Sequence, residues 1–196
     1  MFLLLCRSLM DIQHIAVIGS GQMGNGIAQV AACAGYNVTM VDIKNEFVNK
    51  GMETIRRSLQ KLVSKERMSQ NEADLAISRI QTSTENNSCE NADLVVEAIP
   101  EIPELKYSTF SNLDSICKDS TILATNTSSI SIDSIADSTS RPERVIGMHF
   151  MNPVPIMKLI EVINGSDTSS EVTSAVLSVA EKMGKTPLMC NDSPGF

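Results

Sequence analysis

The stretch Ile15-Ala-Val-Ile-Gly19-Ser-Gly21-Gln-Met-Gly24-Asn-Gly26-Ile-Ala28 decides the fold of this 196-residue chain. Its first four residues form an apolar run, which suits a strand covered on both faces. Gly19 permits a tight turn, Gly21 leaves room for a pyrophosphate, and Gly24 lets the following helix pack closely on the strand. The stretch therefore predicts a strand, a glycine turn and a helix that together bind a dinucleotide.

The helix behind the glycines offers a phosphate site without any basic side chain. Its first amides are unpaired and carry about half a unit of positive charge, which favours an anion. Glycines at this spacing also occur in an ordinary strand-turn-helix that binds nothing. Here, however, a second predicted strand ends in Asp42, about twenty residues after the glycines, and this context favours the dinucleotide interpretation.

Asp42 indicates which dinucleotide binds. A carboxylate at the end of the second strand accepts hydrogen bonds from ribose hydroxyls, whereas it would repel a 2′-phosphate. The sequence therefore predicts NAD rather than NADP, although the nearby Lys44 leaves room for use of both. The alternative is that Asp42 only closes a turn.

Strands and helices alternate along the chain, which predicts an α/β fold with a Rossmann-type, doubly wound and mostly parallel sheet. Gly35 is expected to end the first helix, and Ser69-x-x-Glu72 is a capping box that begins another. We expect strands at 14–19, 37–41, near 80, 93–98, 121–125, 144–148, 158–163 and 186–189. We expect helices at 23–34, 45–65, after 69, 103–116, 131–136 and 169–182.

Composition excludes several classes of protein. With 42% hydrophobic and 20% charged residues, the chain fits one globular domain with a core. Its net charge of −7 argues against nucleic-acid binding, which needs a basic face.

The cysteines are odd in number and form no Cys-x-x-Cys pair, so we expect no disulfide framework, no metal and a reducing cytoplasm. They are Cys6, Cys33, Cys89, Cys117 and Cys190.

The first residues carry no predicted chemistry. Their apolar run, residues 2–5, is far shorter than the roughly 20 residues that span a membrane. It also lacks the basic start and the longer apolar stretch of a secretory signal. We therefore expect no membrane association, an N-terminal extension at 1–11 with Met10 as an alternative start, and an NAD-binding domain at 12–196.

The chain has only two histidines, and they are candidates for a general base. His14 begins the first strand, away from the carboxyl edge where ligands bind in such sheets. His149 directly follows the strand predicted at 144–148, so it should project from that edge into the cofactor crevice. A neutral imidazole with a pKa of about 6.5 suits proton removal from an alcohol. We therefore expect His149 to be the base; the alternative is a surface or packed histidine.

Glu161 interrupts the apolar run Leu159–Ile163, where an isolated buried carboxylate would be costly. His149 is the candidate partner, because a carboxylate fixes the imidazole tautomer and favours the imidazolium formed on proton uptake. The alternative is a strand-end glutamate that faces solvent. Ser128 follows the strand at 121–125 and reaches the same edge, but a serine in such a loop also makes local hydrogen bonds.

Several motifs together resemble the 3-hydroxyacyl-CoA dehydrogenase family, close to its 3-hydroxybutyryl-CoA type, over residues 12–196. They are the glycine stretch, Val95-Val-Glu-Ala-Ile99, Asn126-Thr-Ser-Ser129, His149-Phe-Met-Asn-Pro153, Met157-Lys-Leu-Ile-Glu161 and Asp192-Ser-Pro-Gly-Phe196. The resemblance implies NAD-dependent oxidation of a (3S)-3-hydroxyacyl-CoA to the 3-oxoacyl-CoA, in fatty-acid β-oxidation or butanoate metabolism. Met151 stands where the family often has phenylalanine, and Thr125 where it often has serine.

The resemblance also implies roles for individual residues. His149 would be the general base, Glu161 its electrostatic partner, and Ser128 a hydrogen-bond donor to the substrate oxygen. The residues implied to contact NAD are Gly19, Gly21, Gln22, Met23, Gly24, Asp42, Glu101, Lys106, Asn126 and Asn152. Those implied to approach the acyl-CoA substrate are Ser58, Lys65 and Ser128.

The family pattern continues beyond the point where this sequence stops. In the family, the Pro-Gly-Phe segment leads to a substrate-binding asparagine and then to a helical domain that closes the site and dimerises. We therefore expect a cofactor domain that carries most of the active site, and a homodimer only where the helical domain is supplied. Three alternatives stay open: a catalytically silent NAD-binding module, half of a split enzyme, and a dehydrogenase for a free hydroxy acid, such as the crystallin-related gulonate enzymes.

Overall fold

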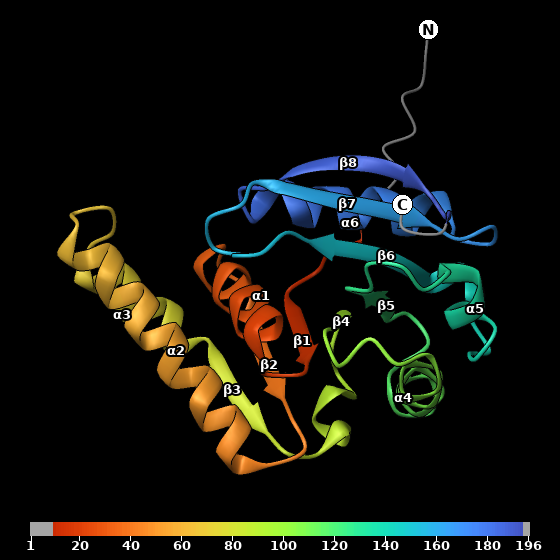
Figure 1. The fold of residues 1–196 in the computed structure, drawn as a ribbon, viewed down its shortest axis with the longest axis horizontal. Coiled ribbons are helices and arrows are strands. Elements are labelled where there is room, and N and C mark those ends of the chain that lie inside the picture. The colour runs from red at the N-terminus through yellow and green to blue at the C-terminus, as the bar shows by residue number, and fades with distance from the viewer. Residues whose placement is uncertain (1–9, 194–196) are drawn as a thin grey trace, which may run out of the picture.

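The computed structural model describes residues 10–193, so the predicted N-terminal run at 1–9 and the Pro-Gly-Phe segment at 194–196 lie outside the described residues. An eight-stranded sheet forms the centre of the fold, in the order β3-β2-β1-β4-β5-β6-β7-β8 (Figure 1). The strands are β1 (His14–Ile18), β2 (Asn37–Val41), β3 (Ile80–Ser83), β4 (Leu94–Glu97), β5 (Ile122–Thr125), β6 (Val145–Phe150), β7 (Leu159–Asn164) and β8 (Thr186–Asn191).

The first six strands are parallel to one another. β7 pairs antiparallel to β6, and β8 pairs parallel to β7. The predicted Rossmann-type sheet, doubly wound and mostly parallel, is therefore confirmed.

Helices cover both faces of this sheet. One face packs against α1 (Gln22–Cys33), α2 (Asn45–Ser64), α3 (Gln70–Ser78) and α6 (Ser170–Lys182), and the other against α4 (Pro103–Ile116) and α5 (Ile132–Ala136). In β1, Ile15 and Val17 belong to the first core, whereas Ala16 and Ile18 belong to the second. This double burial is why the strand is apolar from Ile15 to Ile18. No helix in residues 10–193 is long and apolar enough to cross a membrane.

The predicted helix ends are present. The Ser69 hydroxyl accepts a hydrogen bond from the Glu72 amide at 3.2 Å, and the Glu72 carboxylate accepts one from the Ser69 amide at 2.8 Å, which completes the capping box of α3. Gly35, with a φ of +95°, follows the end of α1. Both signals are local, so the sequence alone could specify them.

Two predicted strands end two residues too early, while the other predicted ends differ from the structure by at most one residue. β6 continues to Phe150 instead of ending at Met148, because β7 pairs with it there: His149 lies opposite Glu161, and Phe150 opposite Ile160. His149 is therefore inside a strand and not directly after it. β8 also continues beyond its predicted end, to Asn191. The 3-10 helices η1 (Asn86–Cys89) and η2 (Pro142–Arg144) were not predicted, because such short turns have no periodic pattern.

The turn between β1 and α1 requires glycine at two positions. Gly19 has a φ of +99°, and a Cβ there would lie 2.6 Å from the carbonyl oxygen of Ala98. A Cβ on Gly24 would lie 1.8 Å from the carbonyl oxygen of Gly19. At Gly21 a Cβ would meet nothing within 4 Å, so open space lies in front of the first amides of α1.

Candidate active site

The carboxyl ends of β1, β4, β5 and β6 meet where the strand order changes direction, the place where doubly wound sheets bind ligands. A cavity of about 310 Å³ opens there. Six of the thirteen residues predicted to bind NAD or to act in catalysis line it, and they come from segments far apart in the sequence. Its walls include Met23, Ala98, Ile99, Glu101, Asn126, Ser128, His149, Phe150, Met151 and Asn152.

His149 and Glu161 face each other across β6 and β7. The Nδ1 atom of His149 lies 2.8 Å from a carboxylate oxygen of Glu161, and the two side chains are 19% and 21% exposed. The structure thus brings the two residues together as predicted, and it explains how an apolar strand accommodates a carboxylate. In the neutral imidazole, a proton held at Nδ1 by Glu161 makes Nε2 the proton acceptor.

Ser128 lies on the same cavity and is held by Glu101. The Ser128 amide donates to the Glu101 carboxylate at 2.8 Å, its hydroxyl lies 3.4 Å from the same oxygen, and the Thr127 hydroxyl donates to it as well. Burial raises the pKa of Glu101, but these hydrogen bonds and the charge of Lys106 outweigh burial and leave the pKa below its usual value. Glu101 is therefore an anion at neutral pH that orients the Ser128 loop.

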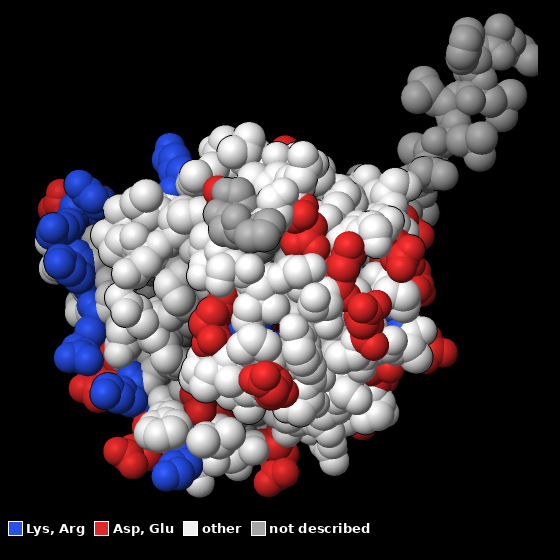
Figure 2. All heavy atoms as spheres, turned by 45° about the vertical axis from the view of Figure 1, so that its right-hand side comes forward, with Lys and Arg blue, Asp and Glu red and all other residues white. Residues whose placement is uncertain are grey.

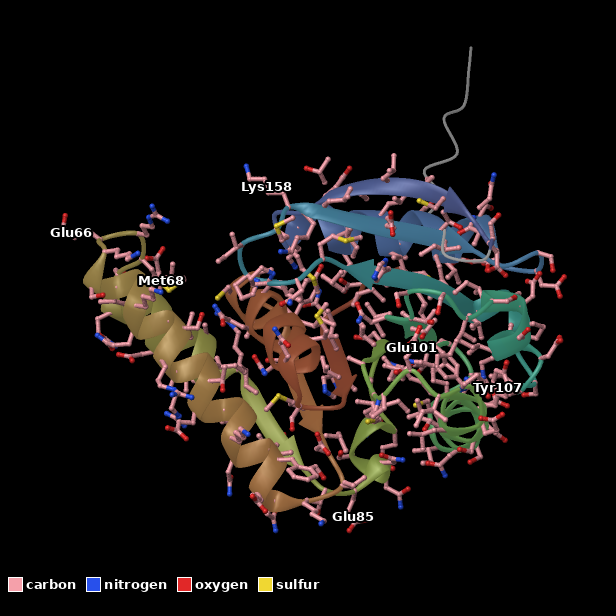
Figure 3. The ribbon with its side chains drawn as sticks, viewed as in Figure 1. Glu66, Met68, Glu85, Glu101, Tyr107 and Lys158 are labelled. Carbon is pink, nitrogen blue, oxygen red and sulfur yellow. The ribbon has the colours of Figure 1, made fainter. Side chains whose placement is uncertain are left out.

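Lys106 does not line the cavity. Its side chain is 1% exposed, and its ammonium lies 2.6 Å from Glu97 and 3.2 Å from Glu101 (Figure 3 labels Glu101). It is connected to the cavity through the Glu101 carboxylate. Its predicted contact with NAD stays a prediction.

Glu97 lines neither cavity but is hydrogen-bonded to residues at and behind the first one, and the sequence analysis did not predict its role. It is fully buried at the end of β4 and accepts hydrogen bonds from Lys106, from the Ile99 amide at 2.7 Å and from the Thr125 hydroxyl at 2.7 Å. A glutamate within an apolar strand was the signal that drew attention to Glu161, and the same signal was present here. Thr125, which differs from the family's common serine, keeps the hydroxyl that Glu97 needs.

Asp42 stands at the end of β2, as expected. Its carboxylate accepts hydrogen bonds from the amide and the hydroxyl of Ser20, both at 2.7 Å, and from the Ile43 amide at 2.8 Å. It thereby ties β2 to the glycine turn. Its contact with a ribose stays a prediction.

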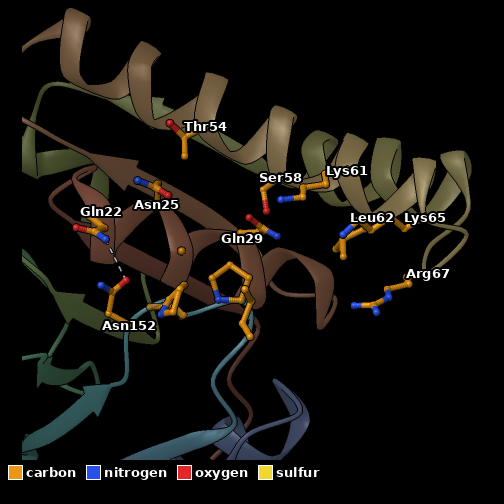
Figure 4. Close-up of a pocket in the computed structure, with 15 residues that line it drawn as sticks. Gln22, Asn25, Gln29, Thr54, Ser58, Lys61, Leu62, Lys65, Arg67 and Asn152 are labelled. Carbon is orange, nitrogen blue, oxygen red and sulfur yellow. Dashed lines mark hydrogen bonds between the residues drawn. The ribbon is translucent and has the colours of Figure 1, made fainter.

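Two asparagines join the elements around the cavity. The Asn126 side chain accepts a hydrogen bond from the Phe150 amide at 2.8 Å and connects β5 to β6. The side-chain NH2 group of Gln22 donates to the side-chain oxygen of Asn152 at 3.1 Å, which connects α1 to the loop after β6 (Figure 4). Both asparagines line the cavity, where the resemblance places contacts with NAD.

A second cavity, of about 370 Å³, lies between α1, α2 and the loop at 151–158 (Figure 4). Ser58 and Lys65 line it, as do Lys61 and Arg67, which the sequence analysis missed. A helical spacing of three or four residues joins Ser58, Lys61 and Lys65, so one face of α2 could have revealed the larger set. Asn152 borders both cavities, which makes them neighbours.

Basic side chains gather on one flank of the molecule, although the chain is acidic overall (Figure 2). The segment from 44 to 67 holds almost half of the 16 lysines and arginines: Lys44, Lys50, Arg56, Arg57, Lys61, Lys65 and Arg67. Three of these line the second cavity. A polyanion would be attracted to this flank rather than to the rest of the surface.

Comparison with known proteins agrees with this geometry. The sequence model of the NAD-binding domain of 3-hydroxyacyl-CoA dehydrogenase matches residues 14–193. The chain is 49% identical over 187 residues to a Bacillus subtilis protein named "Probable 3-hydroxybutyryl-CoA dehydrogenase", covering 95% of this chain and 65% of that protein. It is 43% identical to the 3-hydroxybutyryl-CoA dehydrogenase of Clostridioides difficile, with coverages of 93% and 65%.

A solved structure shares the fold over nearly the whole chain. The (S)-3-hydroxybutyryl-CoA dehydrogenase of Ralstonia eutropha superposes with a TM-score of 0.93 at 43% identity, covering 95% of this chain and 66% of that one. The chain thus spans about two thirds of the length of the relatives that it matches. It belongs to the 3-hydroxyacyl-CoA dehydrogenase family, and residues 14–193 correspond to that family's NAD-binding domain.

Proposed function

We propose that this chain binds NAD in the first cavity and a 3-hydroxyacyl-CoA in the second, and that it serves the oxidation of the (3S)-hydroxyl to a ketone. One observation carries the proposal. His149, which is hydrogen-bonded to Glu161, lines a cavity that shares Asn152 with a second, basic cavity, so a proton acceptor stands beside a site for a phosphate-bearing substrate.

The residues present fit NAD. The space at Gly21 is open in front of the first amides of α1, which would face the pyrophosphate. Asp42 ends β2 with a carboxylate and no basic neighbour is bonded to it within the described residues, which favours ribose hydroxyls over a 2′-phosphate. When bound, NAD accepts a hydride from C3 of the substrate.

The residues of the chain handle the proton. Nε2 of His149 takes the proton of the C3 hydroxyl, while Glu161 holds Nδ1 and stabilises the imidazolium that forms. Glu101 holds the Ser128 backbone amide, and the Ser128 hydroxyl turns its single proton from Glu101 to the substrate oxygen. Lys61, Lys65 and Arg67 pair with phosphates of the CoA moiety, and Ser58 adds a hydrogen bond.

The assay that tests the proposal follows NADH formation from (3S)-3-hydroxybutyryl-CoA, with free 3-hydroxybutyrate as the comparison. It is run on this chain alone and with the C-terminal third of the Bacillus subtilis relative supplied, because the chain spans only part of its relatives. Preference for the thioester supports the proposal. Oxidation of the free acid alone would favour a hydroxy-acid dehydrogenase, and NADH binding without oxidation in either format would favour a silent module.

Two further properties belong to the same proposal. We place the protein in the cytoplasm, in keeping with free cysteines at 33, 89, 117 and 190. We also expect a homodimer only where the family's helical domain is present.

The Asp42 carboxylate should set the cofactor preference. We expect the wild-type chain to bind NADH more tightly than NADPH, and Asp42→Ala to narrow that gap. Because Asp42 also holds Ser20, the variant should bind both cofactors less tightly than the wild type binds NADH. Fluorescence titration with the two cofactors measures this, and equal affinities in the wild type would refute the assignment.

The basic wall of the second cavity should determine CoA affinity. Lys61→Met and Lys65→Met are each expected to weaken CoA binding at least about fivefold, since a charge-assisted hydrogen bond contributes on the order of 1 kcal/mol. The control is Lys50→Met, which removes the same charge from α2 outside the cavity wall. Calorimetric titration with CoA measures the affinity of each variant. A similar loss of CoA affinity in all three variants would mean that the overall charge, and not the cavity wall, determines the affinity.

A further inference from the structure

The loop that joins β6 to β7, residues 151–158, forms a wall of both cavities. Asn152 borders both, and Val154 and Ile156 line the second. The amides of Ile156 and Met157 both donate to the Pro153 carbonyl at 3.0 Å, so the loop contains a tight turn. The position of this turn determines the shape of the two cavities.

The turn contacts α1 on one side. A Cβ on Gly26 would lie 2.8 Å from the Cβ of Val154, so the absence of a side chain at this position lets the loop approach the helix closely. Val154 is 2% exposed. The Gln22–Asn152 hydrogen bond is a second link between α1 and the loop.

The side chain of Lys185 binds backbone carbonyls of the turn. This lysine stands between α6 and β8 and is 8% exposed, and its ammonium donates to the carbonyls of Val154 and, at 2.8 Å, Met157. None of the described carboxylates forms an ion pair with it. Burial lowers the pKa of Lys185, because a buried ammonium without a counter-charge is unfavourable. The carbonyls of the turn are the compensation that the structure supplies.

We propose that Lys185 is a positioning residue for the active site. Its ammonium fixes the turn at 153–157 and thereby positions Asn152 at both cavities and Val154 at the second cavity, where CoA is proposed to bind. The end of the loop does not depend on it, since the Thr186 amide donates to the Lys158 carbonyl at 2.8 Å and continues the ladder of β7 and β8. Loss of the ammonium should therefore release the turn while leaving the sheet paired.

The test is Lys185→Met, which keeps the length of the side chain and removes the donors. Hydrogen exchange, normalised to the amides of β4, should become at least about tenfold faster at Ile156 and Met157. Affinity for CoA, a readout that rests on the proposed function, should fall at least about fivefold. Lys158→Met removes a charge from an exposed position on the same loop (Figure 3) and should change neither quantity.

A second control separates positioning from general destabilisation. Arg141 is another buried cation that donates to backbone carbonyls, those of Asp114, Cys117 and Lys118, and it also forms an ion pair with the Asp114 carboxylate. Its partners lie outside the loop at 151–158, and it lines neither cavity. Arg141→Met should lower the unfolding temperature without changing exchange at Ile156 and Met157.

The outcomes are distinct. Exchange at Ile156 and Met157 equal to that of the wild type in Lys185→Met would overturn the proposal. If that variant does not fold, Lys185→Gln replaces it. The glutamine side chain can make at most part of the same contacts, so exchange at Ile156 and Met157 should be intermediate between the wild type and full release. Exchange equal to that of the wild type would overturn the proposal here as well. A wild-type chain that does not bind CoA would refute the substrate assignment, while the exchange data would still decide the role of Lys185.

Discussion

Replacing His149 by glutamine is expected to lower kcat for (3S)-3-hydroxybutyryl-CoA at least about a hundredfold, the lower range for a positioned general base. Glutamine retains a polar side chain of similar reach but cannot take up the hydroxyl proton. Affinity for NADH should change little, because the phosphate and ribose contacts proposed here come from the glycine turn and Asp42. Steady-state kinetics and NADH titration measure the two quantities, and a kcat within a few-fold of the wild type would exclude His149 as the base.

The same proton should make His149 and Glu161 interdependent. Glu161→Gln removes the charge that stabilises the imidazolium but preserves a hydrogen-bond acceptor beside Nδ1. Because this variant acts through the imidazole, it should lower kcat little further when His149 is already glutamine. A double variant that shows the full product of the two single effects would mean that the residues act independently.

The part of the fold that sequence predicted depends on local signals. The glycine turn requires residues without a Cβ within a few positions of one another, and the capping box of α3 joins Ser69 to Glu72. The apolar strands of the parallel sheet alternate with helices at spacings that permit few other arrangements. These features need no knowledge of distant parts of the chain.

The errors arise where distant segments meet. The end of β6 depends on pairing with β7, and the sequence of β6 alone contains no sign that Phe150 would find a partner in Ile160. The apolar run around Glu161 did reveal an anomaly, because a buried carboxylate needs a partner and His149 was the nearest candidate. Lys185 gave no such signal, since its partners are backbone carbonyls, which are present at every residue.

The Glu97–Lys106–Glu101 network yields the prediction with the largest effect on stability. Lys106 is 1% exposed and Glu97 is fully buried, so removing the lysine leaves a carboxylate without its closest cation. Breaking a buried ion pair on one side typically destabilises a protein by about 3–5 kcal/mol, because the remaining charge cannot be hydrated. We therefore expect Lys106→Met to lower the free energy of unfolding by about that amount, as measured by urea denaturation.

An exposed pair provides the matched control. Lys118 forms an ion pair with Asp93 at the same 2.6 Å distance as Lys106 with Glu97, but the lysine is 42% exposed. Water can hydrate either group when its partner is lost, so Lys118→Met is expected to cost at most about 1 kcal/mol. Equal losses in the two variants would show that distance, rather than burial, determines the effect.

Repairing the network tests its cause. In the variant Glu97→Gln with Lys106→Met, no buried charge is left at position 97. The glutamine oxygen can still accept a hydrogen bond from the Ile99 amide, and the glutamine NH2 group can donate one to the Thr125 hydroxyl oxygen. Much of the lost stability should return, since replacing a buried pair by neutral groups of similar size is often close to neutral. Glu101 would remain without its lysine, so NADH affinity and the orientation of Ser128 should not recover in parallel with stability. Recovery of both stability and NADH affinity would mean that Lys106 contributes to the fold alone. Recovery of neither would mean that the destabilisation comes from lost packing rather than from the unpaired charge.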